Sequence, residues 1–442
     1  MTSQPESSPL EVAIVGCGIA GLTAAIALRQ HPYINVKIYE KATELKEIGA
    51  SIALGPNGLR TLERLGLHNA ISDEVAFRGP SNLPMIYRHW KTNEVIGVDR
   101  HEDVNQYLHR TARYHRAHLH QALLENVPRG IIHLGKQLVS VDVDSRDGVT
   151  LKFQDGTVVT ADILLGADGL RSGVRSSFVP DFQLKWSGWT AFRAVFPTSL
   201  VESIPGLPAD STHWWGLSTN FFASRLGKNT FTVVGGLQSD PSNPNPHIAN
   251  AEWDQDASLQ LFKDTYENWN PVVKALVDAT PSPLRFYPNL SCEGPLPTWV
   301  FGDRATLIGD AAHAHGGAHA TGGSLAIDDA YAFYLSLLTV FPLNAIVKPN
   351  REGIGKALRL YEEVRKPHVE KLLNRVLEAN AAKVERIRSG KLETDEELGE
   401  RAARGSNTIW LHEHDVVKAF EATLSRRNEI LVQGEAEVYA KL

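Results

Sequence analysis

The sequence predicts an α/β fold in which a Rossmann-like dinucleotide-binding domain is interrupted by a sheet domain and followed by C-terminal helices. Two observations carry this prediction. Buried strands run directly into polar or glycine-rich turns at residues 12–21, 161–175 and 305–310, which is the pattern of parallel strands in a doubly wound sheet. Residues 180–300 instead combine alternating strands, concentrated tryptophan and phenylalanine, and prolines in loops, which is typical of an antiparallel sheet.

The first strand ends in the most informative motif of the chain. The segment VAIVGCGIAG places Gly16, Gly18 and Gly21 in a GxGxxG turn between the strand and a helix over 22–28. The first glycine permits the tight turn, the second lets a pyrophosphate approach the backbone, and the third lets the helix pack on the strand. Glu40 closes the next strand about twenty residues on, where a ribose contact is expected. This spacing predicts a dinucleotide site.

Further elements follow along the chain. We expect a short strand and an amphipathic helix within 47–66, and a helix over 113–124 that places Arg116 and His120 on one face. Residues 355–385 predict a long charged helix. The remainder, to residue 442, is expected to add more helix across the outside.

Composition excludes several classes of protein. The chain has 442 residues, 43% hydrophobic and 22% charged, as a soluble protein of two or three domains would have. A net charge of −6 argues against nucleic acid or an acidic membrane as the main partner. The longest apolar stretch, 332–342, is too short to span a bilayer. With Cys17 and Cys292 as the only cysteines, neither a disulfide framework nor a thiolate metal site is predicted.

The two ends of the chain bear on location. The polar start, residues 1–9, has no apolar core and predicts a frayed tail, not a signal peptide. The terminal Ala440-Lys441-Leu442 is similar to the serine-lysine-leucine peroxisomal address, although a chance terminus explains it as well. We therefore expect a cytoplasmic protein, or a peroxisomal one if the tripeptide is read.

Three motifs stand in a fixed order along the chain. They are the glycine turn at Gly16, the segment GADG at 166–169 and the segment LIGDAAH at 307–313. Together they closely resemble the group A flavoprotein monooxygenases, which are single-component aromatic hydroxylases that use FAD, and most of all the salicylate hydroxylase-like branch with its fungal members. The resemblance runs from residue 12 to about 375. It implies the para-hydroxybenzoate hydroxylase-like fold, in which the interrupted domain binds FAD and the antiparallel sheet binds substrate.

The resemblance implies an enzyme that hydroxylates a phenolic or benzoic acid-type substrate, using O2 and NADH or NADPH, through a flavin C4a-hydroperoxide. FAD is expected to stay bound and the nicotinamide donor to dock only transiently. Decarboxylating hydroxylation of a salicylate-like acid and hydroxylation of a phenolic polyketide or other aromatic secondary metabolite are both compatible with the motifs. The expected partners are this aromatic substrate and O2, with no nucleic acid, no integral membrane segment and no metal, in a monomer or homodimer.

The same resemblance sets the expected domain limits. The FAD-binding domain is expected at 10–75, 100–180 and 300–350. The substrate-binding sheet is expected at 76–99 and 181–299, and a C-terminal helical region at 351–442.

The family's cofactor contacts can be carried onto matching positions of this chain. The resemblance implies that Arg116 reaches the flavin diphosphate and that Asp310 binds ribityl or ribose hydroxyls; capping the following helix is a second role for Asp310 that can coexist with the first. The glycine-rich segment before a helix near Ser324 is expected to hold the flavin ring, and a helix N-terminus there favours the anionic reduced form. Asp168 and Arg175 match a segment associated with FAD and the nicotinamide donor, but a structural turn explains Gly169 just as well. The expected cofactor-binding residues are Gly16, Gly18, Gly21, Glu40, Lys41, Ala50, Arg116, Val139, Asp168, Asp310, Gly322 and Gly323.

Four residues are the candidates for catalysis. Arg193 matches the family's inward arginine in the segment SGWTAFRAVF, and an arginine flanked by apolar residues requires an anion, whether a substrate phenolate or a structural carboxylate. Arg225 stands where the family commonly has a tyrosine and Phe221 near its histidine. His315 and His319 are candidate acid–base groups, or simply polar loop residues, in a segment where Gly317 replaces the family's proline.

Two other classes of protein share the flavin-binding fold. A flavin-dependent halogenase shares the cofactor fold, but its Trp-x-Trp-x-Ile-Pro signature is absent from this chain. A non-catalytic flavin-binding redox module stays open, because the chain departs from the family at Gly317 and Arg225.

Overall fold

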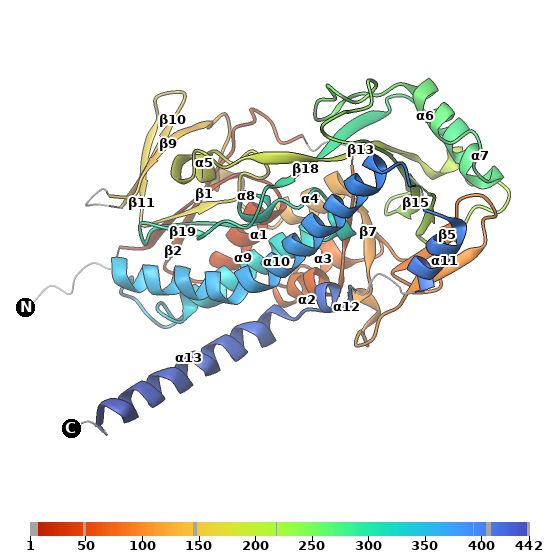
Figure 1. Ribbon diagram of the computed structural model, residues 1–442. Coiled ribbons are helices and arrows are strands. Elements are labelled where there is room, and N and C mark those ends of the chain that lie inside the picture. The colour runs from red at the N-terminus through yellow and green to blue at the C-terminus, as the bar shows by residue number, and fades with distance from the viewer. Residues whose placement is uncertain are drawn as a thin grey trace, which may run out of the picture.

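The protein is described from a computed structural model, which covers residues 8–46, 50–144, 148–217, 219–391, 393–403 and 408–439. The proposed address at Ala440-Lys441-Leu442 lies outside these residues. Figure 1 shows one elongated body with a parallel sheet toward one end, a second sheet toward the other, and long helices running between them.

The strands that lead into the three motifs all belong to one six-stranded sheet. Its order is β19 (Val300–Phe301), β20 (Ala305–Leu307), β12 (Ile163–Gly166), β1 (Leu10–Val15), β2 (Ile34–Tyr39) and β8 (Ile132–His133). β1 pairs in parallel with both β2 and β12, and β12 pairs in parallel with β20. The carboxyl ends of these strands therefore meet at one edge of the sheet, as the sequence predicts.

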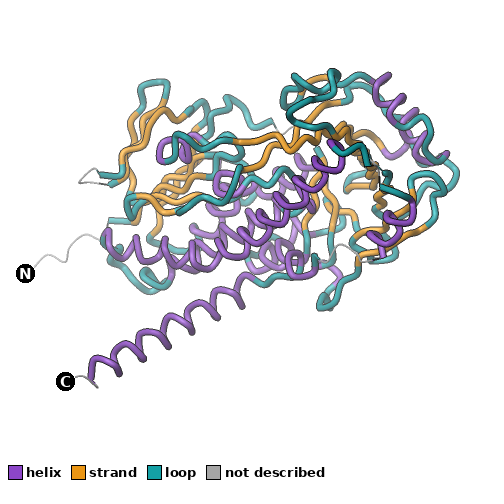
Figure 2. The backbone as a smooth tube through the Cα atoms, in the orientation of Figure 1, coloured by secondary structure: helices purple, strands orange, loops and turns teal. Residues whose placement is uncertain are grey.

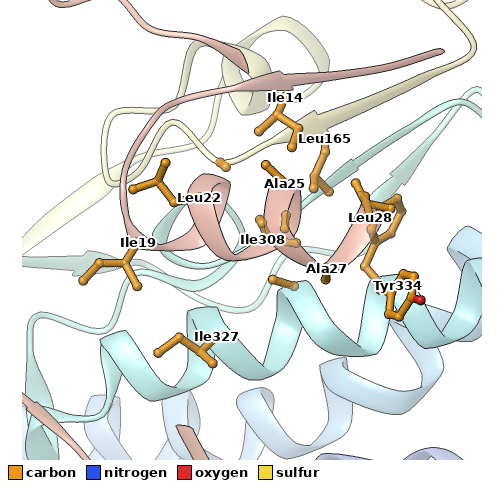
Figure 3. Packing of buried hydrophobic residues seen from close by; sticks show 14 of the residues in the cluster. Ile14, Ile19, Leu22, Ala25, Ala27, Leu28, Leu165, Ile308, Ile327 and Tyr334 are labelled. Atoms are coloured by element: carbon orange, nitrogen blue, oxygen red, sulfur yellow. The ribbon is translucent and has the colours of Figure 1, made fainter. Parts of the chain in front are cut away.

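Helix α1 (Ile19–Leu28) fills the layer between this sheet and α9 (Gly322–Leu338). Its Ala24, Ala25 and Ala27 are fully buried, and these small side chains let the two helices approach closely. In Figure 3, Leu22 and Ala25 lie beneath Ile14 and Leu165 of the strands, and Ile327 of α9 lies on the other side of α1. This packing fixes the N-termini of both helices at the edge where the motifs meet.

One predicted helix begins later than expected. Instead of a helix over 113–124, the structure has β7 (Ala112–His115) followed by α4 (Arg116–Leu124). β7 pairs on one side with β3 (Ser51–Leu54) and on the other with β4 (Ala76–Phe77), and these ladder hydrogen bonds outweigh the helical pattern of the segment. As a result Arg116 is the first helical residue.

The second sheet is antiparallel over most of its width. Its order is β17 (Gln255–Asp256), β18 (Arg285–Cys292), β13 (Leu184–Pro197), β16 (Thr230–Gln238), β15 (Asn220–Leu226), β14 (Thr212–Trp215), β5 (Met85–His89) and β6 (Val95–Asp99). One face packs on α6 (Leu259–Thr265) and α7 (Pro271–Ala279) through an aromatic cluster that includes Phe192, Phe221 and Phe262. We call this the outer face, and the opposite one the inner face.

Smaller elements complete these two units. A three-stranded sheet consists of β9 (Leu138–Asp142), β10 (Val149–Phe153) and β11 (Val158–Ala161). The short helical elements are α2 (Pro56–Arg64), α3 (His68–Ile71), η1 (Tyr107–His109), η2 (Arg129–Ile131), α5 (Gly173–Phe178), η3 (Thr198–Leu200), α8 (Asp310–His313) and η4 (Ala318–Ala320).

The C-terminal part is helical, as predicted, but it does not all lie flat on the body. α10 (Arg351–Arg388) runs along the body from the end that holds the parallel sheet to the second sheet, whereas α13 (Val416–Tyr439) projects away from it (Figures 1 and 2). Between them, α11 (Asp395–Ala403) packs near β6 and α12 (Ile409–His412) near α2. Across the described ranges, we find no helix that is both long and apolar enough to cross a bilayer.

Candidate cofactor and active site

The glycine turn after β1 forms an open cradle. Gly16 has φ +106°, and a Cβ there would collide with the Ala167 carbonyl, so only glycine fits where β1 meets the turn after β12. Gly18 caps α1 without a side-chain hydrogen bond, and a Cβ built on it would meet nothing within 4 Å. The first amides of α1 therefore face free space, which suits a pyrophosphate on a helix N-terminus.

Glu40 lies at one wall of this cradle. Its carboxylate accepts hydrogen bonds from the backbone N–H of Cys17 at 2.8 Å and of Ala42 at 2.9 Å. These two bonds fix the carboxylate beside the glycine turn. Lys41, the next residue, is exposed. Burial, and then the Glu40 charge, raise the pKa of the Cys17 thiol to about 12, so this cysteine stays a neutral packing residue.

The segment after the GADG motif contacts the LIGDAAH motif. The half-buried Asp168 accepts from Ser172 Oγ at 2.5 Å and from the Val174 N–H at 3.1 Å, which caps the start of α5. The Arg175 guanidinium donates to the carbonyl oxygens of Leu170 at 2.6 Å and Ala311 at 2.9 Å. Asp168 thus holds the turn after β12 onto α5, and Arg175 holds the same turn against α8. These bonds use hydrogen-bonding groups that a cofactor would otherwise engage.

Asp310 presents a carboxylate at the open edge of the sheet. It begins α8, its side chain is exposed, and its Oδ1 lies 3.9 Å from where a Cβ on Gly322 would stand. Arg116 lies across from it: burial lowers the pKa of the Arg116 guanidinium, and the Asp310 charge opposes that shift. The N–H of Arg116 donates to the carbonyl of Ala50 at 2.8 Å, so β3 and α4 are joined here.

The remaining expected cofactor residues lie at different depths. Gly323 packs against Ile52 of β3, so the N-terminus of α9 adjoins the strand that begins directly after Ala50. Val139, on β9, is 64% exposed and lies beside the α5 segment. The structure therefore gathers the glycine turn, Glu40, Arg116, Asp310 and the start of α9 along one edge, and leaves Val139 at the rim.

This edge fits a dinucleotide. It combines an open glycine cradle at the N-terminus of α1, two carboxylates suited to ribose or ribityl hydroxyls, one half-buried arginine for a diphosphate, and a second helix N-terminus at Gly322.

Arg193 lies on the inner face of the second sheet. It is half-buried, its guanidinium carbon is 5.3 Å from the centre of the Tyr287 ring, and burial lowers its pKa. Its Nη2 would be 3.8 Å from a Cβ on Gly317, so it faces the loop between α8 and α9. Among the residues described, no carboxylate lies within ion-pair distance of it, and its Nε has no hydrogen-bond partner. The phenol of Tyr287 donates to Asp254 at 2.6 Å instead.

The loop between α8 and α9 carries both candidate histidines. His315 is 3% exposed and its Nε2 lies 3.3 Å from Thr321 Oγ1. Burial lowers the pKa of His315, against the charge of Asp310. The exposed His319 has φ +56°, a left-handed conformation that is uncommon outside glycine. Partial enclosure by the protein, followed by the nearby His315, lowers the pKa of His319 to about 4.

The structure does not place Arg225 near Arg193 and the two loop histidines. The β13–β16–β15 register aligns Arg193 with Val234 and Phe222, so Arg225, three positions further along β15, points to the outer face. There its guanidinium donates to the Pro208 carbonyl at 3.3 Å. Phe221 is likewise buried in the outer aromatic cluster. The expected alignment of this strand places both side chains on the wrong face, because a shift of one residue exchanges the two faces.

Two further histidines approach the site. His213 shares the inner face with Phe222, its Nδ1 accepts from the Trp215 indole at 3.2 Å, and burial lowers its pKa to about 4. Alternation beside the Trp214-Trp215 pair could have identified it. His412 reaches the end of β3 from α12, with its Nδ1 3.0 Å from where a Cβ on Gly55 would stand. Nothing in the local sequence signals that long-range placement.

Comparisons with known proteins agree with this geometry. A family model described as "FAD binding domain" matches residues 9–214. The 6-hydroxynicotinate 3-monooxygenase of Pseudomonas fluorescens is 32% identical over 329 residues, which is 72% of this chain and 80% of that one. A salicylate hydroxylase of Pseudomonas putida is 29% identical over 428 residues, 92% of each chain. A solved salicylate hydroxylase substrate complex superposes with a TM-score of 0.76 at 25% identity, covering 94% of this chain and 98% of that one. The predicted fold class, resemblance and FAD cofactor are confirmed, while the fungal affiliation stays a prediction.

Proposed function

We propose, since the chain belongs to the family of FAD-dependent aromatic monooxygenases, that its own substrate is a phenolic or benzoic acid-type compound whose anionic group is bound by Arg193. FAD supplies the reduction of oxygen and its delivery to the ring, with NADH or NADPH as the electron source that is typical of the family. What this chain contributes is binding, orientation and the control of protons.

The observation that carries the proposal is the missing partner of Arg193. A half-buried guanidinium is costly unless it is paired with an anion, yet no carboxylate in the described residues lies within ion-pair distance. Its guanidinium faces the loop at Gly317, between the inner sheet face and the start of α9. A substrate carboxylate or phenolate placed there would complete the pair and fix the ring against the edge that carries Asp310 and Gly322.

The loop histidines are neutral at pH 7, because the pKa values of both His315 and His319 are lowered. A lowered pKa makes each imidazole a weaker base, so removal of a phenol proton depends mainly on the positive charge of Arg193, which favours the phenolate, and a neutral imidazole serves only as the nearby proton acceptor. His315 is held by Thr321, whereas His319 is exposed, and we assign the exchange of protons to His319. Loss of a phenol proton makes the ring more electron-rich, which favours attack by an electrophilic oxygen.

A panel assay tests the proposal. FAD-loaded protein is mixed with NADH or NADPH and a series of hydroxybenzoates, and donor oxidation and oxygenated product are both followed. Product formed in step with donor oxidation supports the proposal, and loss of carbon dioxide from a salicylate-type acid would mark decarboxylating hydroxylation. Stimulation by neutral phenols but not by acids would contradict the role given to Arg193.

The expected location stays open in one respect. The tripeptide Ala440-Lys441-Leu442 is proposed as a peroxisomal address only on its likeness to serine-lysine-leucine. Expression of the full chain with and without these residues, followed by imaging, tests it, and an unchanged distribution would refute the address.

A further inference from the structure

A fully buried carboxylate lies directly behind the turn that presents Asp310. Asp329, on α9, accepts hydrogen bonds through Oδ2 from the Gly309 N–H at 2.9 Å and from His313 Nε2 at 2.6 Å. Its Oδ1 accepts from Arg365 Nε of α10 at 2.8 Å. One side chain thus joins the two ends of the GDAAH segment to the long C-terminal helix.

The backbone that Asp329 holds is unusual. Gly309 has φ +61° and ψ −144°, a region that is open essentially to glycine alone. A Cβ at this position would also lie 3.2 Å from the Ala326 Cβ. Because Gly309 immediately precedes Asp310, its conformation decides whether the Asp310 carboxylate points to the open edge or into the protein. The bond from Asp329 to the Gly309 N–H therefore acts on the direction of Asp310.

Arg365 supplies the opposite charge that makes this buried carboxylate tolerable. Both side chains are fully buried. Burial alone would raise the pKa of Asp329, but contacts with His313 and Arg365 outweigh it and lower the pKa to about 2. Asp329 is therefore an anion that accepts three hydrogen bonds, and charged acceptors form the stronger ones.

We propose that Asp329 is the positioning residue of the flavin site, with Arg365 as its counter-ion. It fixes the turn at Gly309 so that Asp310 faces the cofactor, and it makes FAD affinity depend on α10, a helix outside the segment matched by the family model. The inference rests on the proposed contact between Asp310 and FAD.

FAD affinity of the apoprotein, measured by titration of flavin fluorescence, tests this inference without turnover. Asp329→Asn and Gly309→Ala disturb the same turn by different routes, the first through the buried pair and the second through the glycine itself. Each is expected to weaken FAD binding about tenfold to a hundredfold, the range for losing one hydrogen bond to a charged group. If Asp329→Asn does not fold, Gly309→Ala alone decides, since it leaves the buried ion pair intact.

A double-mutant cycle separates positioning from general damage. If Asp329 acts through Asp310, either variant has little further effect in an Asp310→Asn background, whereas independent damage would be additive. Asp328→Asn is the matched control: Asp328 is equally buried on α9, but it accepts from Asn57 and Thr61. Its FAD affinity should stay within about twofold of the original protein.

The outcomes are distinct. If Asp310→Asn weakens FAD binding but the Asp329 and Gly309 variants do not, or do so additively, the positioning role is refuted and the cofactor role of Asp310 survives. If Asp310→Asn itself leaves FAD affinity unchanged, both are refuted.

Discussion

Replacing Arg193 by methionine tests the substrate role most sharply, because the structure distinguishes an anion-binding arginine from a structural one. Methionine keeps the apolar stem but removes the charged guanidinium group. A structural ion pair would lose about 3–5 kcal/mol of stability when one partner is removed, since a buried charge would be left alone. Arg193 has no carboxylate partner among the described residues, so no charge is left behind. Two effects on the free energy of unfolding should cancel to within about 1 kcal/mol. The variant loses the contact between the guanidinium and the Tyr287 ring, but it no longer has to bury a cation.

The kinetic effect should be large where the stability effect is small. A lost hydrogen bond between charged groups costs about 1.5–3 kcal/mol, which corresponds to a rise in KM for hydroxybenzoates of roughly tenfold to 150-fold. Oxidation of the nicotinamide donor should also become uncoupled from product formation, because a substrate ring that is not held in place is no longer oriented for oxygen transfer. FAD affinity should not change.

A control for this variant is available on the neighbouring strand. Arg225→Met removes the same group from the outer face, where its partner is the Pro208 carbonyl, and it should leave KM unchanged. The assays are thermal unfolding, FAD titration and steady-state oxidation with product analysis. A fall of several kcal/mol in the stability of Arg193→Met, or equal KM effects of the two variants, would refute the reasoning.

Three other predictions follow from the described contacts. Gly18→Ala should weaken FAD binding without changing apoprotein stability, because its Cβ meets only the open cradle, whereas Gly16→Ala should lower stability itself; equal melting temperatures would contradict this. Burial lowers the pKa of His414 from the ordinary 6.5 to about 3, so the neutral side chain stabilises the folded protein fully above pH 6.5. This stabilisation is lost as the pH falls, by up to about 1.4 kcal/mol per pH unit. His414→Asn should therefore make the free energy of unfolding less dependent on pH between 7.5 and 5.5, as measured by denaturant titrations at each pH. Cys17, with its raised pKa and 2% exposure, should resist alkylation by iodoacetamide in the folded protein at pH 8, and modification at the rate of the unfolded chain would contradict its buried position.

The cofactor edge could be predicted from sequence because its determinants are local. Gly16 and Gly309 are required by their own backbone angles, and each follows a buried strand whose direction the apolar pattern reveals. Parallel strands then bring their carboxyl ends together without further information. This is why three short motifs predict one shared edge of the sheet.

The substrate side could not be predicted as well, because it depends on register and on distant contacts. Arg225 differs from an inner-face position by one residue, and only the pairing with β16 shows which face it takes. The helix expected from residue 113 lost its first turn to pairing with β3, a partner about sixty residues earlier. His412 contacts the end of β3 from α12, and Arg365 contacts the buried Asp329 from α10; neither long-range contact is signalled by the sequence of its own helix.

Incorporation of isotopically heavy oxygen tests the central claim most directly. FAD-loaded protein is incubated with NADH or NADPH and a hydroxybenzoate that stimulates donor oxidation, under labelled O2, and the aromatic product is weighed by mass spectrometry. We expect one labelled oxygen atom in each product molecule, with Arg193→Met giving donor oxidation but little labelled product. Donor oxidation that yields only unlabelled aromatic compound, or no stimulation by any aromatic acid, would contradict an aromatic monooxygenase that anchors its substrate at Arg193.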